Sequence, residues 1–337
     1  MARDHSKPPP KATPLEALQQ VQPSPPPAEA RASGADAPAG LNRKYLRVND
    51  LRRLRNLFFS GRRVVEGQYA GRHASPMRGH SVEFSDYRVY MPGDEIADVD
   101  WKIYGRSDKL FIKLFEHQSD MTVSLLVDGS ASMAYAGLDG EYSKYDHACM
   151  MAAAVAFLTT RQQDKVSFGL SQNGLVQFHR PHRSFGHLMG ILDAMENTSL
   201  GGKAGLPDAL RKMASQIGHR GLLIVFSDLL DDPQGIFKGL SVFTHRGSEV
   251  ILFHILHADE LSLPDVHESV FVDSETLGRV SMNVEDIRPA YEKKLSRFIH
   301  TWSSACRGRG IDYKLISTAT HYREALEDYL FQRASMA

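Results

Sequence analysis

The sequence predicts an α/β fold in which helices cover both faces of a mostly parallel β-sheet. From Met121 onward, short apolar runs alternate with helical segments, as in parallel sheets whose strands are buried on both faces. Asn173-Gly174 joins two of these runs and is a strong hairpin signal, so one strand is expected to run antiparallel at an edge. Apolar residues make up 42% of the 337-residue chain, which is enough for a sizeable core.

The expected elements follow one another in a regular order. Strands are expected over 122–127, 166–170, 175–178, 222–226, 250–256 and 313–316. Helices are expected over 145–160, 184–196, 207–216, 233–243, 284–306 and 322–332. Ser184 suits an N-cap and Pro207 suits a first helical turn. Right-handed crossovers would bring the C-terminal ends of the parallel strands to one rim, where such sheets bind ligands.

Two segments precede this domain, which we place at residues 121–332. Residues 1–40 hold nine of the sixteen prolines and few large apolar side chains, so we expect a disordered Pro/Ala-rich tail. Residues 41–120 are expected to form a basic helix and then a small β-containing segment. In that segment, 108–115 is interpreted as a strand and 91–94 as a turn.

The basic segment 43–78 carries ten Lys and Arg against two acidic residues. Its apolar residues Val48, Leu51, Leu54 and Phe58 recur at helical spacing. We favour a solvated basic face on a helix that packs against the main domain. Binding of nucleic acid or another anionic surface is the alternative, but no aromatic stacking pattern accompanies the charge.

The composition as a whole indicates no particular partner. Lys and Arg together number 40, as do Asp and Glu. The two cysteines lie far apart in the sequence, so neither a disulfide framework nor a zinc motif is expected. No apolar run is long enough to span a bilayer, and no secretory signal is recognisable at the N-terminus. A cytoplasmic location is therefore expected.

Polar residues follow two of the buried strands. Asp128, Ser130 and Ser132 leave the end of the first strand as D-x-S-x-S, and Asp228 ends the strand over 222–226. These side chains are expected to meet at one rim, since parallel strands end there together. Hard oxygen ligands of this kind suit Mg²⁺, with Asp228 reaching the ion through a bound water. Simple turn capping by Asp and Ser is the structural alternative.

D-x-S-x-S together with a strand ending in Ser-Asp resembles the metal-ion-dependent adhesion site of von Willebrand A domains. The resemblance implies a von Willebrand A-like, Rossmann-like fold with Asp128, Ser130, Ser132 and Asp228 as the site residues. It also implies that Mg²⁺, or Mn²⁺ as a substitute, is bridged by an acidic group of a protein partner. Such chemistry is adhesion and breaks no bond.

An upstream signature consists of Gly71, His73, Ser75, Gly79, Glu83, Phe84, Arg88, Tyr90, Pro92, Gly93, Asp94, Asp100 and Trp101. This signature resembles that of the bacterial "domain of unknown function fifty-eight" family. Members carry a von Willebrand A-like domain after this signature and are associated with MoxR-type AAA+ ATPases in complex maturation. The resemblance covers about residues 45–320. An arginine common after the Gly-Asp step is missing here. We interpret the signature residues as structural, rather than as partner contacts.

One departure from the adhesion-site pattern bears on the metal. A second loop of that site usually supplies a threonine, often as Gly-Gly-Thr, whereas this chain has Gly201-Gly202-Lys203. A protonated lysine cannot ligate a metal. Lys203 would repel Mg²⁺, or its ammonium would take the place of the ion and pair with Asp128. The sequence leaves both possibilities open.

The expected function is therefore a non-enzymatic protein-interaction module. Its rim would receive an acidic group of a partner, through Mg²⁺ or through Lys203, and the implied partner is a MoxR-type ATPase or its client. A metal-dependent hydrolase is the enzymatic alternative. It is disfavoured because the chain has no H-E-x-x-H motif, no G-x-S-x-G elbow and no P-loop. We interpret the clustered histidines, among them His179, His182 and His187, as surface residues.

Overall fold

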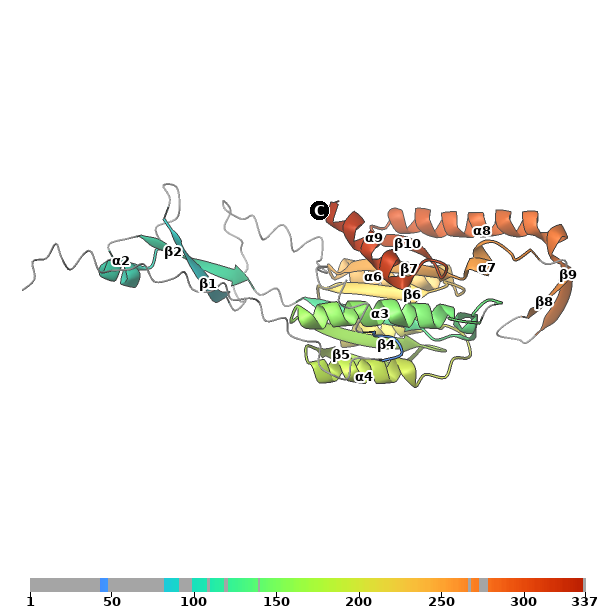
Figure 1. Cartoon of the computed structure of the whole chain (residues 1–337), viewed down its shortest axis with the longest axis horizontal. Helices are drawn as coiled ribbons and strands as arrows, with labels where there is room; N and C mark the ends of the chain where they lie inside the picture. Colours follow the sequence, from blue (N-terminus) through green and yellow to red (C-terminus); the bar gives the residue numbers. More distant parts are fainter. Residues whose placement is uncertain are drawn as a thin grey trace, which may run out of the picture. The chain divides into compact units, whose positions relative to one another are not determined.

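A computed structural model describes residues 43–47, 82–90, 99–107, 110–117, 121–138, 140–265, 268–272 and 278–335. Its main domain is a three-layer α/β structure around one six-stranded sheet (Figure 1). The basic helix expected around Val48 to Phe58 lies outside the described residues, and so do Gly93 and Asp94.

The six-stranded sheet has the order β10-β7-β6-β3-β4-β5. Its strands are β3 (Thr122–Asp128), β4 (Lys165–Ser171), β5 (Leu175–His182), β6 (Leu222–Ser227), β7 (Glu249–Leu256) and β10 (Asp312–Ser317). All neighbours are parallel except β4 and β5, which form the antiparallel edge hairpin expected at Asn173-Gly174. Asn173 has φ 55° and Gly174 has φ 108°, which is the left-handed turn geometry that Asn-Gly favours. The strand order and the antiparallel edge confirm the predicted von Willebrand A-like fold.

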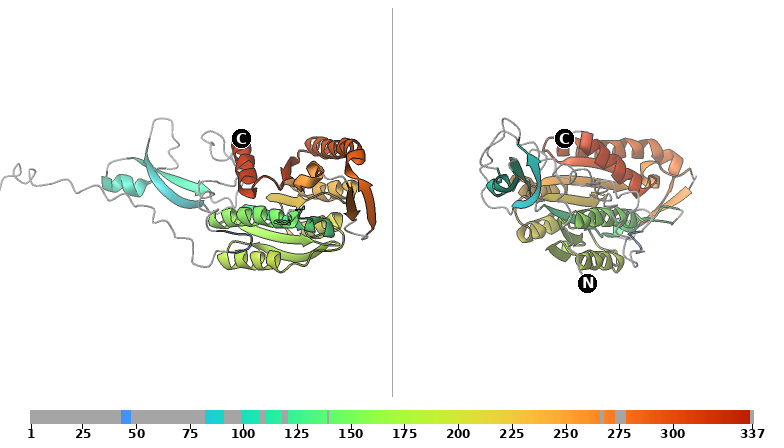
Figure 2. Two further views of the ribbon diagram at one scale, coloured as in Figure 1. Left: turned by 45° about the vertical axis from the view of Figure 1, so that its right-hand side comes forward. Right: turned by 60° about the vertical axis from the view of Figure 1, so that its left-hand side comes forward.

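Helices cover both faces of this sheet (Figure 2). They are α3 (Lys144–Arg161), α4 (Phe185–Glu196), α5 (Leu206–Gln216), α6 (Pro233–His245), α7 (Ala258–Leu261), α8 (Val284–Arg307) and α9 (Tyr322–Ser335), with a 3₁₀ turn, η3 (Ala131–Ala134), after β3. Side chains of α5, α6 and α8 share one apolar core with β3, β6 and β7. On the opposite face, α3 packs against the same strands and contacts α4 and α9. Burial on both faces explains why the central strands consist mostly of apolar residues.

Local sequence signals set the helix starts. Ser184 caps α4 by accepting a hydrogen bond from the backbone of His187, as expected, and Pro207 lies in the first turn of α5. Ser143 and Asp146 form a capping box at the start of α3. An alanine-rich stretch, Ala152 to Ala156, lies within the buried part of α3, where small side chains allow close approach to the sheet. The first turn of α3, which Ser143 caps, contributes a residue to the candidate site.

The upstream segment forms a separate two-stranded antiparallel sheet with one helix. Its elements are β1 (Val82–Val89), β2 (Phe111–His117) and α2 (Trp101–Ser107). Glu83 and Arg88 lie on β1, and the backbone of Tyr90 donates to Leu110. Asp100 caps α2 by accepting from the backbone of Lys102 and Ile103, while Trp101 is exposed and packs edge-to-face against Tyr104. Asp100 therefore has a structural role within this segment.

A hairpin that was not predicted from the sequence is inserted between α7 and α8. It consists of β8 (Glu268–Val272) and β9 (Arg279–Asn283). Every β9 side chain is exposed, so the alternating pattern that marks a half-buried strand does not develop.

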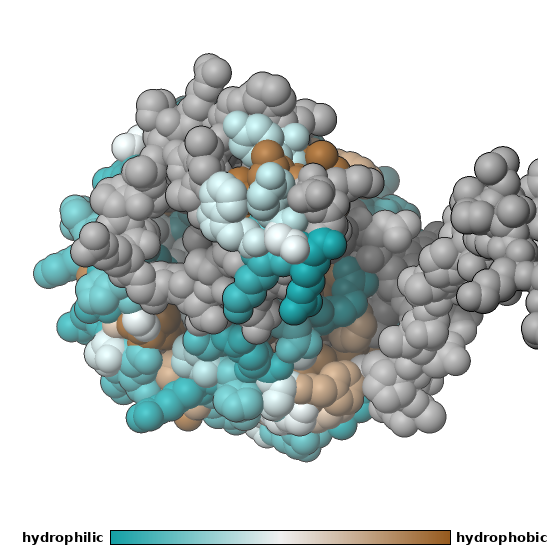
Figure 3. Space-filling model, turned by 90° about the vertical axis from the view of Figure 1, so that its left-hand side faces the viewer, coloured by the Kyte–Doolittle hydropathy of each residue, from teal (hydrophilic) through white to brown (hydrophobic). Residues whose placement is uncertain are grey.

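In the view of Figure 3, the described surface is mostly hydrophilic, with small separate apolar patches.

Candidate functional site

The predicted rim residues converge where the strand order reverses. β3 and β6 are parallel neighbours: the chain after β3 returns as β4 on one side of this pair, and the chain after β6 returns as β7 on the other side. Such a switch point is where open α/β sheets bind ligands. Asp128 ends β3, and Asp228 directly follows Ser227 at the end of β6. The structure thus brings together the residues that the sequence placed at one rim.

Asp128 is fully buried and hydrogen-bonded on both carboxylate oxygens. Ser227 donates its hydroxyl to Oδ2 at 2.6 Å, and the backbone N–H of Ser130 donates to Oδ1 at 2.9 Å. Burial, and then the nearby charge of Asp228, raises the pKa of Asp128 to about 7. Around neutral pH this carboxyl is therefore only partly charged.

Ser130 and Ser132 form a hydroxyl pair at the mouth of the rim. Their Oγ atoms lie 3.1 Å apart, and Ser130 is nearly buried while Ser132 is partly exposed. The second loop lies beside them, because the N–H of Ala131 donates to the carbonyl of Gly202 and the N–H of Gly201 donates to that of Gly129. The Gly201-Gly202-Lys203 run therefore occupies the position expected of the second loop.

Lys203 has its side chain on the surface. Its backbone is held by the β4–β5 turn, since the N–H of Lys203 donates to Oδ1 of Asn173 and its carbonyl accepts from the N–H of Asn173. The ammonium that pairs with a rim carboxylate belongs to a different residue, Lys144.

Lys144 is the site residue that the sequence analysis missed. Its Nζ lies 2.8 Å from Oδ2 of Asp228 and 2.7 Å from Oε1 of Glu260, and its side chain is 0% exposed. Burial lowers the pKa of Lys144, but the two carboxylates outweigh that effect and raise it, so the side chain is charged. The positive end of the helix dipole disfavours a lysine in the first turn of a helix. This unfavourable placement is the sequence signal that could have identified Lys144.

His254, on β7, is the other basic side chain close to Asp228. It is fully buried, and its Nδ1 is hydrogen-bonded to the hydroxyl of Tyr313 at 2.6 Å. Burial lowers the pKa of His254 to about 4, although Asp228 acts in the opposite direction. The imidazole is therefore neutral at pH 7, and the positive charge facing Asp228 comes from Lys144.

Exposed apolar and aromatic side chains border the polar residues of the rim. Tyr135, Leu138 and Tyr142 project from the loop between η3 and α3, with exposures of 40%, 72% and 37%. Leu230 follows Asp228 and is 54% exposed. We call these four residues the apolar collar. The loop is held over the end of β7, because the Tyr135 hydroxyl and the Leu138 N–H both donate to Asp259.

The geometry fits a divalent cation only in part. Two ligands at adjacent corners of a Mg²⁺ octahedron lie about 3 Å apart, which the serine hydroxyls satisfy. The carboxylates fit less well, since Asp228 is paired with the buried ammonium of Lys144, which an ion bound by Asp228 would have to displace. Lys203 also stands where a ligating threonine was expected. The serine hydroxyls and Asp128 therefore suit a divalent ion, whereas the surroundings of Asp228 do not.

The other histidines and acidic residues do not assemble a metal site in the described part of the chain, where no group of three or more His, Cys, Asp or Glu could hold an ion. His179, His182 and His187 form a ring cluster on β5 and α4, with the centroid of His187 5.9 Å from that of His179 and 5.6 Å from that of His182. His187 also hydrogen-bonds the carbonyl of Val166. This cluster is a packing feature of the sheet edge.

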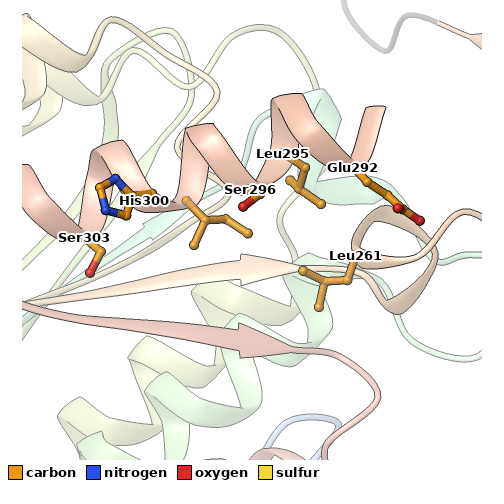
Figure 4. Close-up of a pocket in the computed structure, with 7 residues that line it drawn as sticks. Leu261, Glu292, Leu295, Ser296, His300 and Ser303 are labelled. Carbon is orange, nitrogen blue, oxygen red and sulfur yellow. The ribbon is translucent and has the colours of Figure 1, made fainter. Parts of the chain in front are cut away.

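A separate groove of about 450 Å³ runs along α8 (Figure 4). Its lining comes from one side of that helix and from α7: Leu261, Glu292, Leu295, Ser296, Ile299, His300 and Ser303. None of the rim residues lines it, so it is distinct from the candidate site.

The described start of the basic segment is bound to the main domain. Arg43 pairs with Asp193 and with Glu196, and Lys44 pairs with Asp146. These contacts agree with the packing interpretation of this part, although residues 48–78 lie outside the described chain.

Comparison with known families identifies the chain. The family model described as "Protein of unknown function DUF58" matches residues 86–299, more than half of the sequence. The chain belongs to the DUF58 family. This confirms the family resemblance that the upstream signature indicated.

The DUF58 chain is similar to uncharacterized proteins of Mycobacterium bovis and Mycobacterium tuberculosis. In each case the identity is 26% over 227 residues, which is 66% of this chain and 70% of the relative. Among the residues described, no helix has the length and apolar character needed to cross a membrane.

Solved structures similar to it include an aerotolerance-related membrane protein from Bacteroides fragilis, with 14% identity and a TM-score of 0.40 over 63% of this chain and 99% of that one. BatB from Bacteroides thetaiotaomicron has 13% identity and a TM-score of 0.40, covering 64% and 99%. The SpRpn10 VWA domain has 14% identity and a TM-score of 0.32, covering 41% and 76%.

Proposed function

We propose that this DUF58 protein is a non-enzymatic protein-interaction module whose rim binds an acidic group of a partner. The observation that carries the proposal is the exposed apolar collar on the two loops that follow the rim residues Ser132 and Asp228. Leu138 and Leu230 on these loops are more than half exposed, although most large apolar side chains of the domain are buried. Exposed apolar groups rimmed by polar residues mark protein interaction sites.

The centre of the rim suits a carboxylate. When the buried Ser130 donates within the hydroxyl pair, the hydrogen of the partly exposed Ser132 hydroxyl is available to donate to an incoming carboxylate. The buried ammonium of Lys144, 2.8 Å from Asp228, and the raised pKa of Asp128 both reduce the repulsion that the acidic residues behind them exert on an incoming carboxylate. Hydrogen bonds from neutral hydroxyls to a charged acceptor are among the stronger ones in proteins.

The same geometry argues against nucleophilic catalysis at this rim. A serine nucleophile needs a base within hydrogen-bond reach. In the described part of the chain, the hydroxyls of Ser130 and Ser132 are hydrogen-bonded to each other, and Ser227 donates to Asp128 while accepting from the backbone of Leu229. No histidine takes part in this network, so binding is the better-supported role.

The partner we propose is a MoxR-type AAA+ ATPase or a client of that ATPase, acting in complex maturation. Support comes from membership of the DUF58 family, whose signature led us to expect such a partner.

The test compares two substitutions of an exposed apolar residue by aspartate, one in the apolar collar and one on α9. Leu138→Asp places a charge in the collar and is expected to weaken binding to the ATPase at least tenfold by calorimetry, a loss of about 1.4 kcal/mol. Phe331→Asp is the matched control, since Phe331 is 65% exposed on α9. Equal affinities of both variants and the wild type would contradict the proposal.

A further inference from the structure

Lys144 connects three elements of the rim. It is the first residue of α3, Asp228 follows β6, and Glu260 belongs to α7 beyond β7. Glu260 is itself fixed, because its Oε2 accepts the backbone N–H of His257 at 2.7 Å and its carbonyl accepts the hydroxyl of Tyr291 at 2.6 Å. The ammonium therefore ties together loops that are far apart in the sequence.

A charged group in such a position needs partners. An ammonium removed from water is strongly unfavourable unless it is paired and hydrogen-bonded. Lys144 meets this requirement with two carboxylates, at 2.8 Å and 2.7 Å. Asp228, whose side chain is 1% exposed, likewise requires a cation beside it. Lysine and aspartate are thus mutually necessary in the folded rim.

In an adhesion site of the kind that the motif resembles, the carboxylate corresponding to Asp228 serves a divalent ion. Here Asp228 is already paired with the buried ammonium of Lys144, which it shares with Glu260, and the second loop has Lys203 where a ligand was expected. A divalent ion bound through Asp228 would lie against the buried ammonium of Lys144, and in the described part of the chain Asp128 is the rim aspartate that is not paired with a lysine. The donor set and the charges disagree with a bound Mg²⁺.

We propose that the ammonium of Lys144 is a built-in cation that assembles this rim in place of a divalent metal ion. The rim is then complete in the absence of Mg²⁺ or Mn²⁺. The role of Lys144 in holding the rim together does not depend on which partner the rim binds.

The first test uses the unmodified protein. Thermal unfolding and calorimetry are recorded with Mg²⁺, Mn²⁺ or EDTA. The proposal predicts the same melting temperature in all three conditions and no saturable heat up to millimolar metal. A melting temperature that rises with Mg²⁺ in the wild type, and does not rise in Asp228→Asn, would overturn it.

The second test removes the cation. Lys144→Met keeps the length of the side chain but leaves Asp228 buried without a cation, and breaking such a pair is expected to lower the melting temperature by roughly 10 °C. Adding Asp228→Asn removes the orphaned charge and should restore more than half of that loss. Lys314→Met is the control, since the ammonium of Lys314 is exposed and bonds the amide of Gln332. A Lys144→Met protein as stable as this control would refute the built-in cation.

Discussion

At the residue scale, the site is defined by hydrogen bonds and charges that surround two buried aspartates. The sequence places Asp128 and Asp228 at one rim because parallel strands end together. The cation that pairs with Asp228 could not be derived in the same way. Lys203 was the candidate by position in the motif, whereas Lys144 reaches Asp228 because the loop from Gly129 to Ser143 brings the start of α3 back over the sheet.

Ser227 holds Asp128 in place, and its removal should destabilise the domain. Ser227→Ala deletes the 2.6 Å bond to Asp128 and the acceptor for the N–H of Leu229. Leaving buried groups unsatisfied is expected to lower the free energy of unfolding by about 1–3 kcal/mol, measured by urea denaturation. Ser215→Ala, at an exposed serine that bonds only the carbonyl of Lys212, should change it by less than about 0.5 kcal/mol. A similar effect of both substitutions would argue against this role.

Asp128 should also make stability depend on pH. Burial and Asp228 raise its pKa from 3.8 to about 7. Between these values the folded state holds a proton that the unfolded state has lost, so the stabilising contribution is complete below pH 3.8 and is lost as pH rises through 7. Asp128→Asn cannot lose a proton, and its stability relative to wild type is expected to increase from pH 5 to pH 8 in denaturant titrations. A constant difference across this range would show that Asp128 titrates normally.

At the scale of elements, the short segment 43–47 is bound to the rim side of α3. Tyr45 and Leu46 are each 2% exposed, and the Tyr45 hydroxyl donates to Asp146 of the α3 capping box at 2.9 Å. The two capping-box residues, Ser143 and Asp146, flank Lys144 in the sequence. This segment therefore supports the turn that positions the buried ammonium, although the sequence analysis placed it outside the main domain.

Leu46→Ala tests this support. Leu46 is among the largest fully buried side chains, so truncation is expected to lower the free energy of unfolding by about 2–4 kcal/mol in denaturant titrations. Leu230→Ala, at an exposed leucine, is the control and should cost less than about 0.5 kcal/mol. If Leu46→Ala were as mild as the control, residues 43–47 would not be part of the folded domain.

At the scale of the whole molecule, the sheet was predictable and the surface features were not. Fully apolar runs such as Leu222 to Phe226 have few alternatives to a buried strand, and Asn173-Gly174 fixes the hairpin. The β8–β9 hairpin lacks such a pattern because β9 is exposed throughout. The apolar collar could not be predicted either. The exposure of Leu138 and Leu230 depends on how two loops pack, and no periodic pattern in the sequence reports it.

The most direct test of the interaction rim is the amide hydrogen-exchange footprint of the protein with and without the proposed MoxR-type ATPase. The account predicts slowed exchange in the loops that carry the site, residues 129–143, 201–205 and 228–232. Protection confined to the α8 groove or to the basic segment 43–78, with these loops unchanged, would contradict it.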